Sequence, residues 1–144
     1  MGQVLGIDVG TKTLGLAVSD DAQRVAMPLS VIRRAGMARD LAALAAIVEG
    51  RGITEAVVGL PLNLDGSPGA MTAEADRIVA ALEQMGLVVH REDERLTTVD
   101  AERMLIESDL SRRRRKQVVD KIAATYILQD YLDRTARRGG ADGM

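Results

Sequence analysis

Residues 4–13 of the chain are Val4-Leu5-Gly6-Ile7-Asp8-Val9-Gly10-Thr11-Lys12-Thr13, and they decide the fold. The apolar first half predicts a buried central strand, and the segment after it has the composition of a hairpin turn that leads into a second apolar run at residues 14–20. Asp8 is charged, and an ionised carboxylate in such a strand is costly unless a cation or hydrogen-bond donors compensate it. Asp8 is therefore a candidate metal ligand. The alternative is that it shapes the turn through a bond to the backbone.

Length and composition limit the class of protein. The chain has 144 residues, of which 47% are hydrophobic, and this suits one domain that buries roughly two thirds of the surface of the unfolded chain. We expect that domain to span residues 1–136 and residues 137–144 to be a disordered tail. The N-terminus lacks the features of a signal peptide, and no apolar run approaches the length of a membrane span. The sequence therefore predicts a soluble, cytoplasmic protein without a membrane partner.

Charge and missing residue types narrow the chemistry. The formal net charge is −2, so a polyanion would have to be held by a local basic patch or by bridging metal ions. The chain has no cysteine and a single histidine, His90. Disulfides, thiolate zinc sites, a cysteine nucleophile and histidine-rich metal sites are thereby excluded, and a Ser-His-Asp triad is disfavoured. The remaining acid–base and ligand chemistry is that of carboxylates.

The order of predicted elements indicates an α/β fold. Strands are expected at residues 4–9, 14–20 and 24–33, followed by a helix from residue 38 that is stopped by Gly50 and Gly52. Pro28 places the third strand at the edge of the sheet, because proline cannot donate a hydrogen bond to a neighbouring strand. The rest of the chain predicts a strand at 56–60, a punctuated loop at 61–69, a helix at 73–85, a strand at 87–90, a helix from 97 through 106 and a last helix from 118 to about 134. These elements predict a mixed five-stranded sheet, three strands antiparallel and two parallel, flanked by helices.

Two further groups of carboxylates accompany Asp8. Asp120 lies early in the last predicted helix and continues an apolar stripe that should face the sheet; a carboxylate in a first turn can also serve merely as a partner of the helix dipole. Glu92, Asp93 and Glu94 follow the fifth predicted strand, where acids are ordinarily solvated. If the fourth or fifth strand neighbours the first, one of these acids meets Asp8 and Asp120 at one sheet edge. Oxygen donors alone favour Mg²⁺ or Mn²⁺, often as two ions that drive phosphoryl displacement.

Four motifs in order resemble one family over nearly the whole chain. They are residues 6–12 (GIDVGTK), 58–66 (VGLPLNLDG), 93–98 (DERLTT) and 120–124 (DKIAA). The chain resembles the YqgF (RuvX) family, RuvC-like nucleases of the ribonuclease H-like fold that are described as Holliday junction resolvases and as nucleases maturing the 5′ end of pre-16S rRNA. The resemblance implies that Asp8, Glu94 and Asp120 form a catalytic, metal-binding acidic triad. It selects Glu94 among three neighbouring acids, which the spacing leaves open.

Several residues near these motifs are candidates for binding nucleic acid. Thr11 and Lys12 follow Asp8 and could meet a phosphate, or form ordinary hairpin surface. The long loop either covers the substrate with Asn63 pointing inward or is an ordered structural loop. Arg95, beside Glu94, could contact phosphate or orient the carboxylate. A basic run, Arg112-Arg113-Arg114-Arg115-Lys116, is either a phosphate-gripping arm or solvated surface. His90 is expected to be a packing residue. The chain has no Phe or Trp and two Tyr residues, so we expect recognition of backbone and shape rather than base stacking.

The leading hypothesis is a Mg²⁺-dependent (or Mn²⁺-dependent) endonuclease on structured nucleic acid, with pre-16S rRNA 5′ processing ahead of Holliday junction cleavage. A nucleotide-binding or kinase module is an alternative, because a Gly-Ile-Asp-x-Gly-Thr loop also occurs in actin-like ATPases; those require two such domains and this chain has room for one. A third hypothesis is a non-catalytic RNA-binding ribosome-assembly protein. The residues specify no oligomeric state.

Overall fold

A computed structural model describes residues 2–60, 72–93 and 122–136. The predicted loop at 61–69, the helix from 97 through 106, the basic run at 112–116 and the tail at 137–144 lie outside the described residues. So do four further candidate site residues, Asn63, Glu94, Arg95 and Asp120. The described residues form the sheet and the helices that pack on it.

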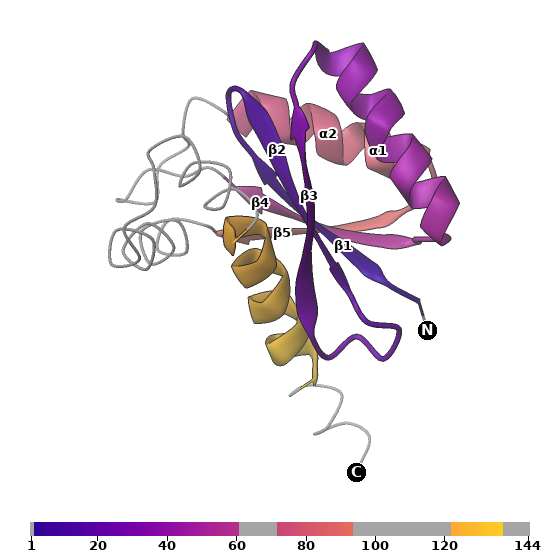
Figure 1. The fold of residues 1–144 in the computed structure, drawn as a ribbon, viewed down its shortest axis with the longest axis vertical. Coiled ribbons are helices and arrows are strands. Elements are labelled where there is room, and N and C mark those ends of the chain that lie inside the picture. The colour runs from indigo at the N-terminus through magenta and orange to yellow at the C-terminus, as the bar shows by residue number, and fades with distance from the viewer. Residues whose placement is uncertain (1, 61–71, 94–121, 137–144) are drawn as a thin grey trace.

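Five strands form one mixed sheet in the order β3-β2-β1-β4-β5 (Figure 1). The strands are β1 (Val4–Val9), β2 (Thr13–Ser19), β3 (Ala26–Arg33), β4 (Glu55–Leu60) and β5 (Val88–Asp93). β1 pairs antiparallel with β2 and parallel with β4, β2 pairs antiparallel with β3, and β4 pairs parallel with β5. The predicted mixed sheet is thus confirmed, with β1 at its centre.

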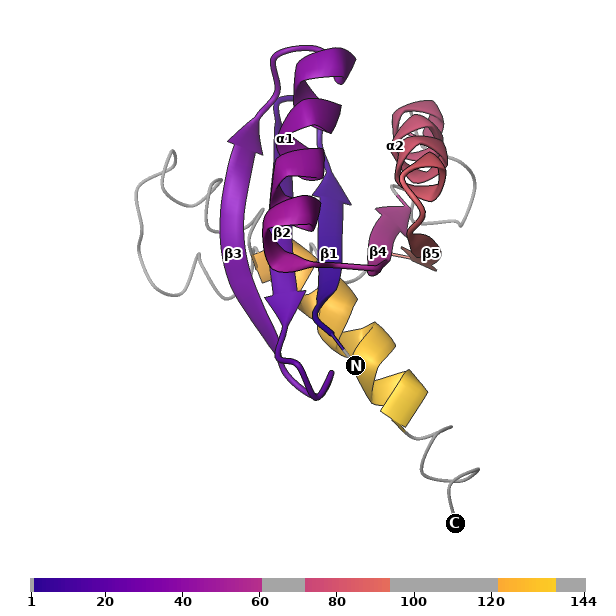
Figure 2. The same ribbon diagram turned by 90° about the vertical axis from the view of Figure 1, so that its right-hand side faces the viewer.

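In the described residues, three helices cover the sheet from both sides. They are α1 (Met37–Arg51), α2 (Thr72–Gln84) and a C-terminal helix described over residues 122–136. α1 ends as predicted at a glycine, because Gly52 adopts the left-handed conformation (φ 63°) that ends a helix and donates its N–H to the Glu49 carbonyl. Figures 1 and 2 show α1 and α2 on one face of the sheet and the C-terminal helix on the other.

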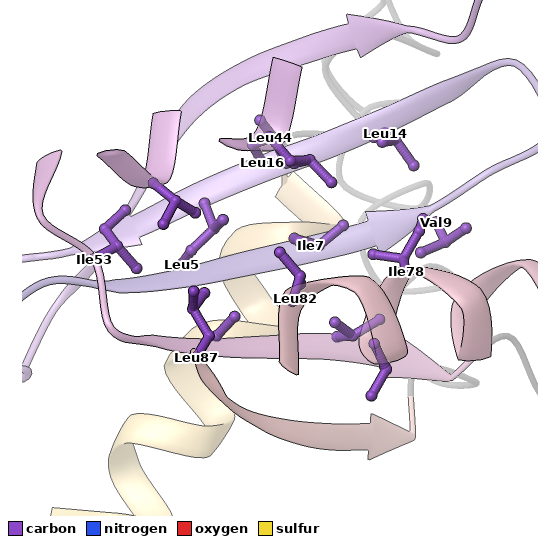
Figure 3. Close-up of a cluster of buried hydrophobic side chains, with 14 of the residues drawn as sticks. Leu5, Ile7, Val9, Leu14, Leu16, Leu44, Ile53, Ile78, Leu82 and Leu87 are labelled. Atoms are coloured by element: carbon purple, nitrogen blue, oxygen red, sulfur yellow. The ribbon is translucent and has the colours of Figure 1, made fainter. Parts of the chain in front are cut away.

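Strand alternation on β1 divides the core into two clusters. Leu5, Ile7 and Val9 belong to a cluster with α1 and α2, which Figure 3 shows around the leucines and isoleucines of those elements. Val4 belongs to a second cluster with Leu128 and other residues of the C-terminal helix. Because successive side chains of a strand point to opposite faces, Asp8 lies on the face of the C-terminal helix.

The C-terminal helix crosses β1 directly over Gly6. A Cβ atom on Gly6 would lie 2.8 Å from the Cβ of Leu128 and 3.1 Å from the carbonyl oxygen of Ala124. The absence of a side chain at this position therefore lets the helix approach the central strand closely.

Two predicted strand boundaries were wrong. The fifth strand was expected at residues 87–90, but β5 runs from Val88 to Asp93, because Glu92 and Asp93 pair with Gly59 and Leu60 of β4. Pairing with a neighbouring strand outweighs the weak strand propensity of acidic residues. The third strand begins at Ala26 rather than at residue 24. Its predicted edge position is confirmed, and Pro28 lies beside a register irregularity opposite Ala17.

Candidate active site

Asp8 lies one residue before the carboxyl end of the central strand, and it is half-buried. Its backbone is opposite Gly15 of β2. On the other side, Ile7 is paired with Val58, so the next residue of β4, Gly59, lies beside Asp8. The residues flanking Asp8 on both neighbouring strands are therefore glycines, which have no side chains.

The carboxyl end of β5 lies at the same sheet edge as Asp8. Gly59 is paired with Glu92, so Asp8, Gly59 and Glu92 form one row across β1, β4 and β5. With strands about 4.8 Å apart, the backbones of Asp8 and Glu92 are roughly 10 Å apart. β4 is a neighbour of β1. This meets the condition under which acids at the end of the fifth strand were expected to approach Asp8.

Glu92 is already neutralised by a cation. Its side chain is 6% exposed and forms an ion pair with Arg134 of the C-terminal helix, which is half-exposed and also lies 3.9 Å from Asp130. A buried carboxylate that is paired with a guanidinium satisfies its charge within the protein. The pair therefore connects β5 to the C-terminal helix and sets Glu92 apart from the candidate metal ligands.

The turn that follows Asp8 presents two of the predicted nucleic-acid-binding residues to solvent. Thr11 and Lys12 are exposed at its tip. The Gly10 N–H donates to the Thr13 carbonyl over 2.9 Å and closes the turn. A Cβ on Gly10 would lie 2.9 Å from that same oxygen, so the turn requires glycine there.

Arg34, which was not predicted from the sequence, forms hydrogen bonds to this turn. It follows β3, and its guanidinium bonds to Asp40 of α1, Glu74 of α2 and the Gly10 carbonyl. Asp40 is the buried member of the group, with 1% of its side chain exposed. The sequence gives no local signal for this cluster, because the partners of Arg34 come from positions 10, 40 and 74, and an acid in a first helical turn is usually exposed.

His90 is a packing residue, as predicted. Its ring stacks on Tyr131 with centroids 4.6 Å apart, and its Nε2 lies 2.8 Å from the Glu55 carboxylate. The Tyr131 hydroxyl donates to the same carboxylate over 2.6 Å. Burial raises the pKa of Tyr131 most and the hydrogen bond to Glu55 second, to about 12. The hydroxyl therefore stays protonated and acts as a donor. This network holds the C-terminal helix against β5.

Within the described ranges, no group of three or more His, Cys, Asp or Glu side chains is arranged to hold a metal ion. Asp8 supplies one hard oxygen donor at an edge where its neighbours on β2 and β4 are glycines, a donor type that suits Mg²⁺ or Mn²⁺. The other two predicted ligands lie outside those ranges.

Sequence comparison decides the family. The sequence profile of RuvX, described as Holliday junction resolvase, matches residues 2–134. The chain belongs to the RuvX family. Its relatives include a protein of Moorella thermoacetica that is 55% identical over 139 residues, covering 95% of this chain and 99% of the relative, and one of Myxococcus xanthus that is 45% identical over 132 residues, covering 91% and 87%. Both are named "Putative pre-16S rRNA nuclease". The predicted resemblance is confirmed.

Solved structures place this RuvX-family chain in the ribonuclease H-like fold. Thermus thermophilus RuvC in complex with a Holliday junction substrate superposes with a TM-score of 0.58 at 18% identity, covering 96% of this chain and 97% of RuvC. The fowlpox virus resolvase, solved with Holliday junction DNA, gives 0.56 at 10% identity, covering 92% and 98%. At these identities the likeness concerns the fold, which is the one predicted.

The helices described for this RuvX-family chain pack on the sheet. In residues 2–60, 72–93 and 122–136, none combines the length and the apolar character that crossing a bilayer requires.

Proposed function

We propose that this RuvX-family chain is a metal-dependent endonuclease that cleaves phosphodiester bonds in structured nucleic acid. The observation that carries the proposal is the position of Asp8: a half-buried carboxylate near the end of the central strand, flanked by glycines, at the edge where β5 also ends. Membership of the family supports it.

We assign the ligands of Mg²⁺ or Mn²⁺ to Asp8, Glu94 and Asp120, which are also the proposed catalytic residues. The bound ions would supply an activated water and a charge that stabilises the leaving oxygen. The ion pair between Glu92 and Arg134 supports the choice of Glu94, because it removes one of the three neighbouring acids from consideration.

The proposed contacts to the phosphate backbone begin at the turn after Asp8. Thr11 and Lys12 are exposed there, so a hydroxyl and an ammonium group are available to a bound strand. We extend the same role to Asn63, Arg95 and the basic run at residues 112–116. Since the chain has a net charge of −2, these local contacts would have to provide the attraction to a polyanion.

As the substrate we propose the 5′ end of pre-16S rRNA, with residues 1–136 acting as one nuclease domain in the cytoplasm, where precursor rRNA occurs. The relatives that carry this activity in their names are 45–55% identical over most of the chain, whereas the junction-bound RuvC is 18% identical. Cleavage of a Holliday junction is the second candidate, favoured by the description of the family profile. Both substrates present structured backbone rather than a base sequence, in keeping with the scarcity of aromatic residues.

The test is cleavage of a 5′-extended 16S rRNA precursor and of a four-way DNA junction, each with and without Mg²⁺, by the wild type and by Asp8→Asn. The asparagine keeps the shape of the side chain and removes the charge at the metal site. It should lower the cleavage rate more than about a hundredfold. Loss of a residue that only hydrogen-bonds to a metal ligand already costs about 10- to 100-fold in metal affinity or activity. Affinity for the uncleaved substrate should change little.

Asp21→Asn is the matched control, because Asp21 is an exposed acid in the turn between β2 and β3. It should retain full activity. Equal activity of Asp8→Asn and the wild type would refute the assigned site. Tight binding of precursor rRNA without cleavage by the wild type would favour a non-catalytic role in ribosome assembly.

A further inference from the structure

Arg34 gathers three acceptors around one nearly buried guanidinium. Its side chain is 11% exposed. Nε donates to Asp40 over 2.9 Å, Nη2 donates to Glu74 over 2.8 Å, and Nη1 donates to the Gly10 carbonyl over 3.1 Å. A planar guanidinium with donors in fixed directions can satisfy three such partners at once, which an ammonium group cannot do in the same geometry.

The backbone of Arg34 adds a second bond to the same turn. Its N–H donates to the Lys12 carbonyl over 2.9 Å. The carbonyls on either side of Thr11, those of Gly10 and Lys12, are therefore both held by Arg34. The tip that presents Thr11 and Lys12 is exposed, but its backbone is tied to the body of the protein.

Asp40 fixes the direction of the guanidinium. One of its carboxylate oxygens accepts from Arg34 Nε and the other accepts from the backbone N–H of Ala35 over 3.0 Å. Asp40 also lies in the first turn of α1, where its own N–H donates to the Gly36 carbonyl. The bonds run from the turn through Arg34 to α1 and, through Glu74, to the first turn of α2.

Hydrogen bonds to two carboxylates keep the Arg34 guanidinium charged despite its burial. Burial by itself lowers the pKa of Arg34, but the hydrogen bonds to Glu74 and Asp40 more than offset it, so the pKa lies above its ordinary value. Buried ion pairs contribute little net stability compared with apolar residues of the same volume. Their advantage is geometric, because the partners accept only one arrangement.

We propose that Arg34 is a positioning residue for the active site: it holds the Gly10–Thr13 turn so that Thr11 and Lys12 stay in register with Asp8. The inference rests on the proposed function for its kinetic consequence. Arg34 itself need not touch the nucleic acid, since it acts through the two carbonyls of the turn. A displacement of about 1 Å at a reacting phosphate can cost about a hundredfold in rate.

The experiment compares Arg34→Gln, Arg34→Lys and the control Arg39→Gln, an exposed arginine on α1 beside Asp40. Cleavage kinetics are measured with the two substrates named above, and amide hydrogen exchange is measured at residues 10 and 34, whose N–H groups close and hold the turn. Both Arg34 variants should lose about tenfold to a hundredfold in kcat with KM within about threefold. Both amides should exchange at least about tenfold faster. Arg39→Gln should match the wild type in each measurement.

Arg34→Lys separates positioning from stability. The ammonium keeps a positive charge beside Asp40, so its melting temperature should stay closer to wild type than that of Arg34→Gln, yet its kcat should fall equally. If Arg34→Gln does not fold, Arg34→Lys alone decides the question. A kcat that recovers in step with stability, or an unchanged exchange rate at residues 10 and 34, would overturn the proposal. If the wild type cleaves neither substrate, the proposed function fails, and the exchange rates still support or overturn the anchoring of the turn.

Discussion

Glu92 shows how one residue at the end of β5 is set apart from its acidic neighbours. Arg134 neutralises it, and only 6% of its side chain is exposed. A carboxylate held in this way contributes to stability through its bond to the guanidinium, about 1.5–3 kcal/mol for a hydrogen bond between charged groups. In the proposed assignment, the metal is bound by an acid that follows Glu92 along the chain.

A set of three amide variants tests this division. Glu92→Gln should cleave at the wild-type rate but unfold about 1–2 kcal/mol more easily in urea, because the bond to Arg134 loses its charge. Glu94→Gln should abolish cleavage, and Asp93→Asn should reduce it partly, since it only neighbours the proposed ligand. Cleavage rates and urea unfolding curves are measured on the same preparations.

Two other patterns would be informative. Loss of activity in Asp93→Asn with activity kept in Glu94→Gln would move the metal site by one residue along the chain. Loss of activity in Glu92→Gln without loss of stability would assign the ligand to Glu92 and contradict the interpretation of its ion pair.

From the sequence alone, Asp8 could be identified as a candidate site residue, and Arg34 could not. Asp8 stands out locally, because it is the one charge in an apolar strand. Arg34 looks like ordinary surface after a strand, since its partners come from positions 10, 40 and 74 and meet only in the folded chain. Long-range polar contacts of this kind leave no periodic pattern.

At the scale of elements, the contact between β1 and the C-terminal helix depends on the bare backbone of Gly6. Gly6→Ala would place a Cβ within 2.8 Å of Leu128 and 3.1 Å of a helix carbonyl, so the helix must shift or the strand must bend. Overpacking of this kind costs about 1–3 kcal/mol. We expect a lower melting temperature for Gly6→Ala, measured by circular dichroism.

Gly50→Ala is the matched control for this substitution. Gly50 lies in the last turn of α1, and a Cβ there would meet nothing within 4 Å. Alanine should stabilise the helix by up to about 1 kcal/mol relative to glycine. A melting temperature of Gly6→Ala equal to or above that of the wild type would show that the helix does not approach β1 as closely as described.

The elements themselves were predictable where the pattern was local. Continuous apolar runs predicted β1 and β2, alternation predicted β3, and proline marked β3 as an edge strand. The length of β5 was not predictable, because its last two residues are acidic and join the sheet only by pairing with β4. The burial of Asp40 was likewise hidden, since an acid at a helix start is usually exposed.

At the scale of the whole molecule, a net charge of −2 means that attraction to nucleic acid has to be local. If Lys12 and the basic run both touch phosphates, each lost contact should lower the slope of log affinity against log salt by about one unit. Lys12→Ala should lose about one unit, and Arg113→Ala with Arg114→Ala about two. Binding is measured with Asp8→Asn as the background, so that the substrate stays intact.

Arg24→Ala provides a control, because Arg24 is exposed in the turn between β2 and β3. Its salt slope should equal that of the parent. A slope unchanged in the Arg113 and Arg114 double variant would make the basic run solvated surface and leave the turn after Asp8 as the phosphate contact.

The order in which the chain leaves the ribosome gives the second core cluster a particular timing. The cluster under α1 and α2 needs residues 5–87, whereas the cluster on the face of Asp8 joins Val4 to Leu132. Contacts so distant in sequence are slow to form, and domains assemble during synthesis from the N-terminus. A nascent chain can therefore fold the larger of its two core clusters before the C-terminal helix covers the face that carries Asp8. On this account, the face that carries the proposed active site is covered only after residues 122–136 have been synthesised and their helix has docked on the sheet.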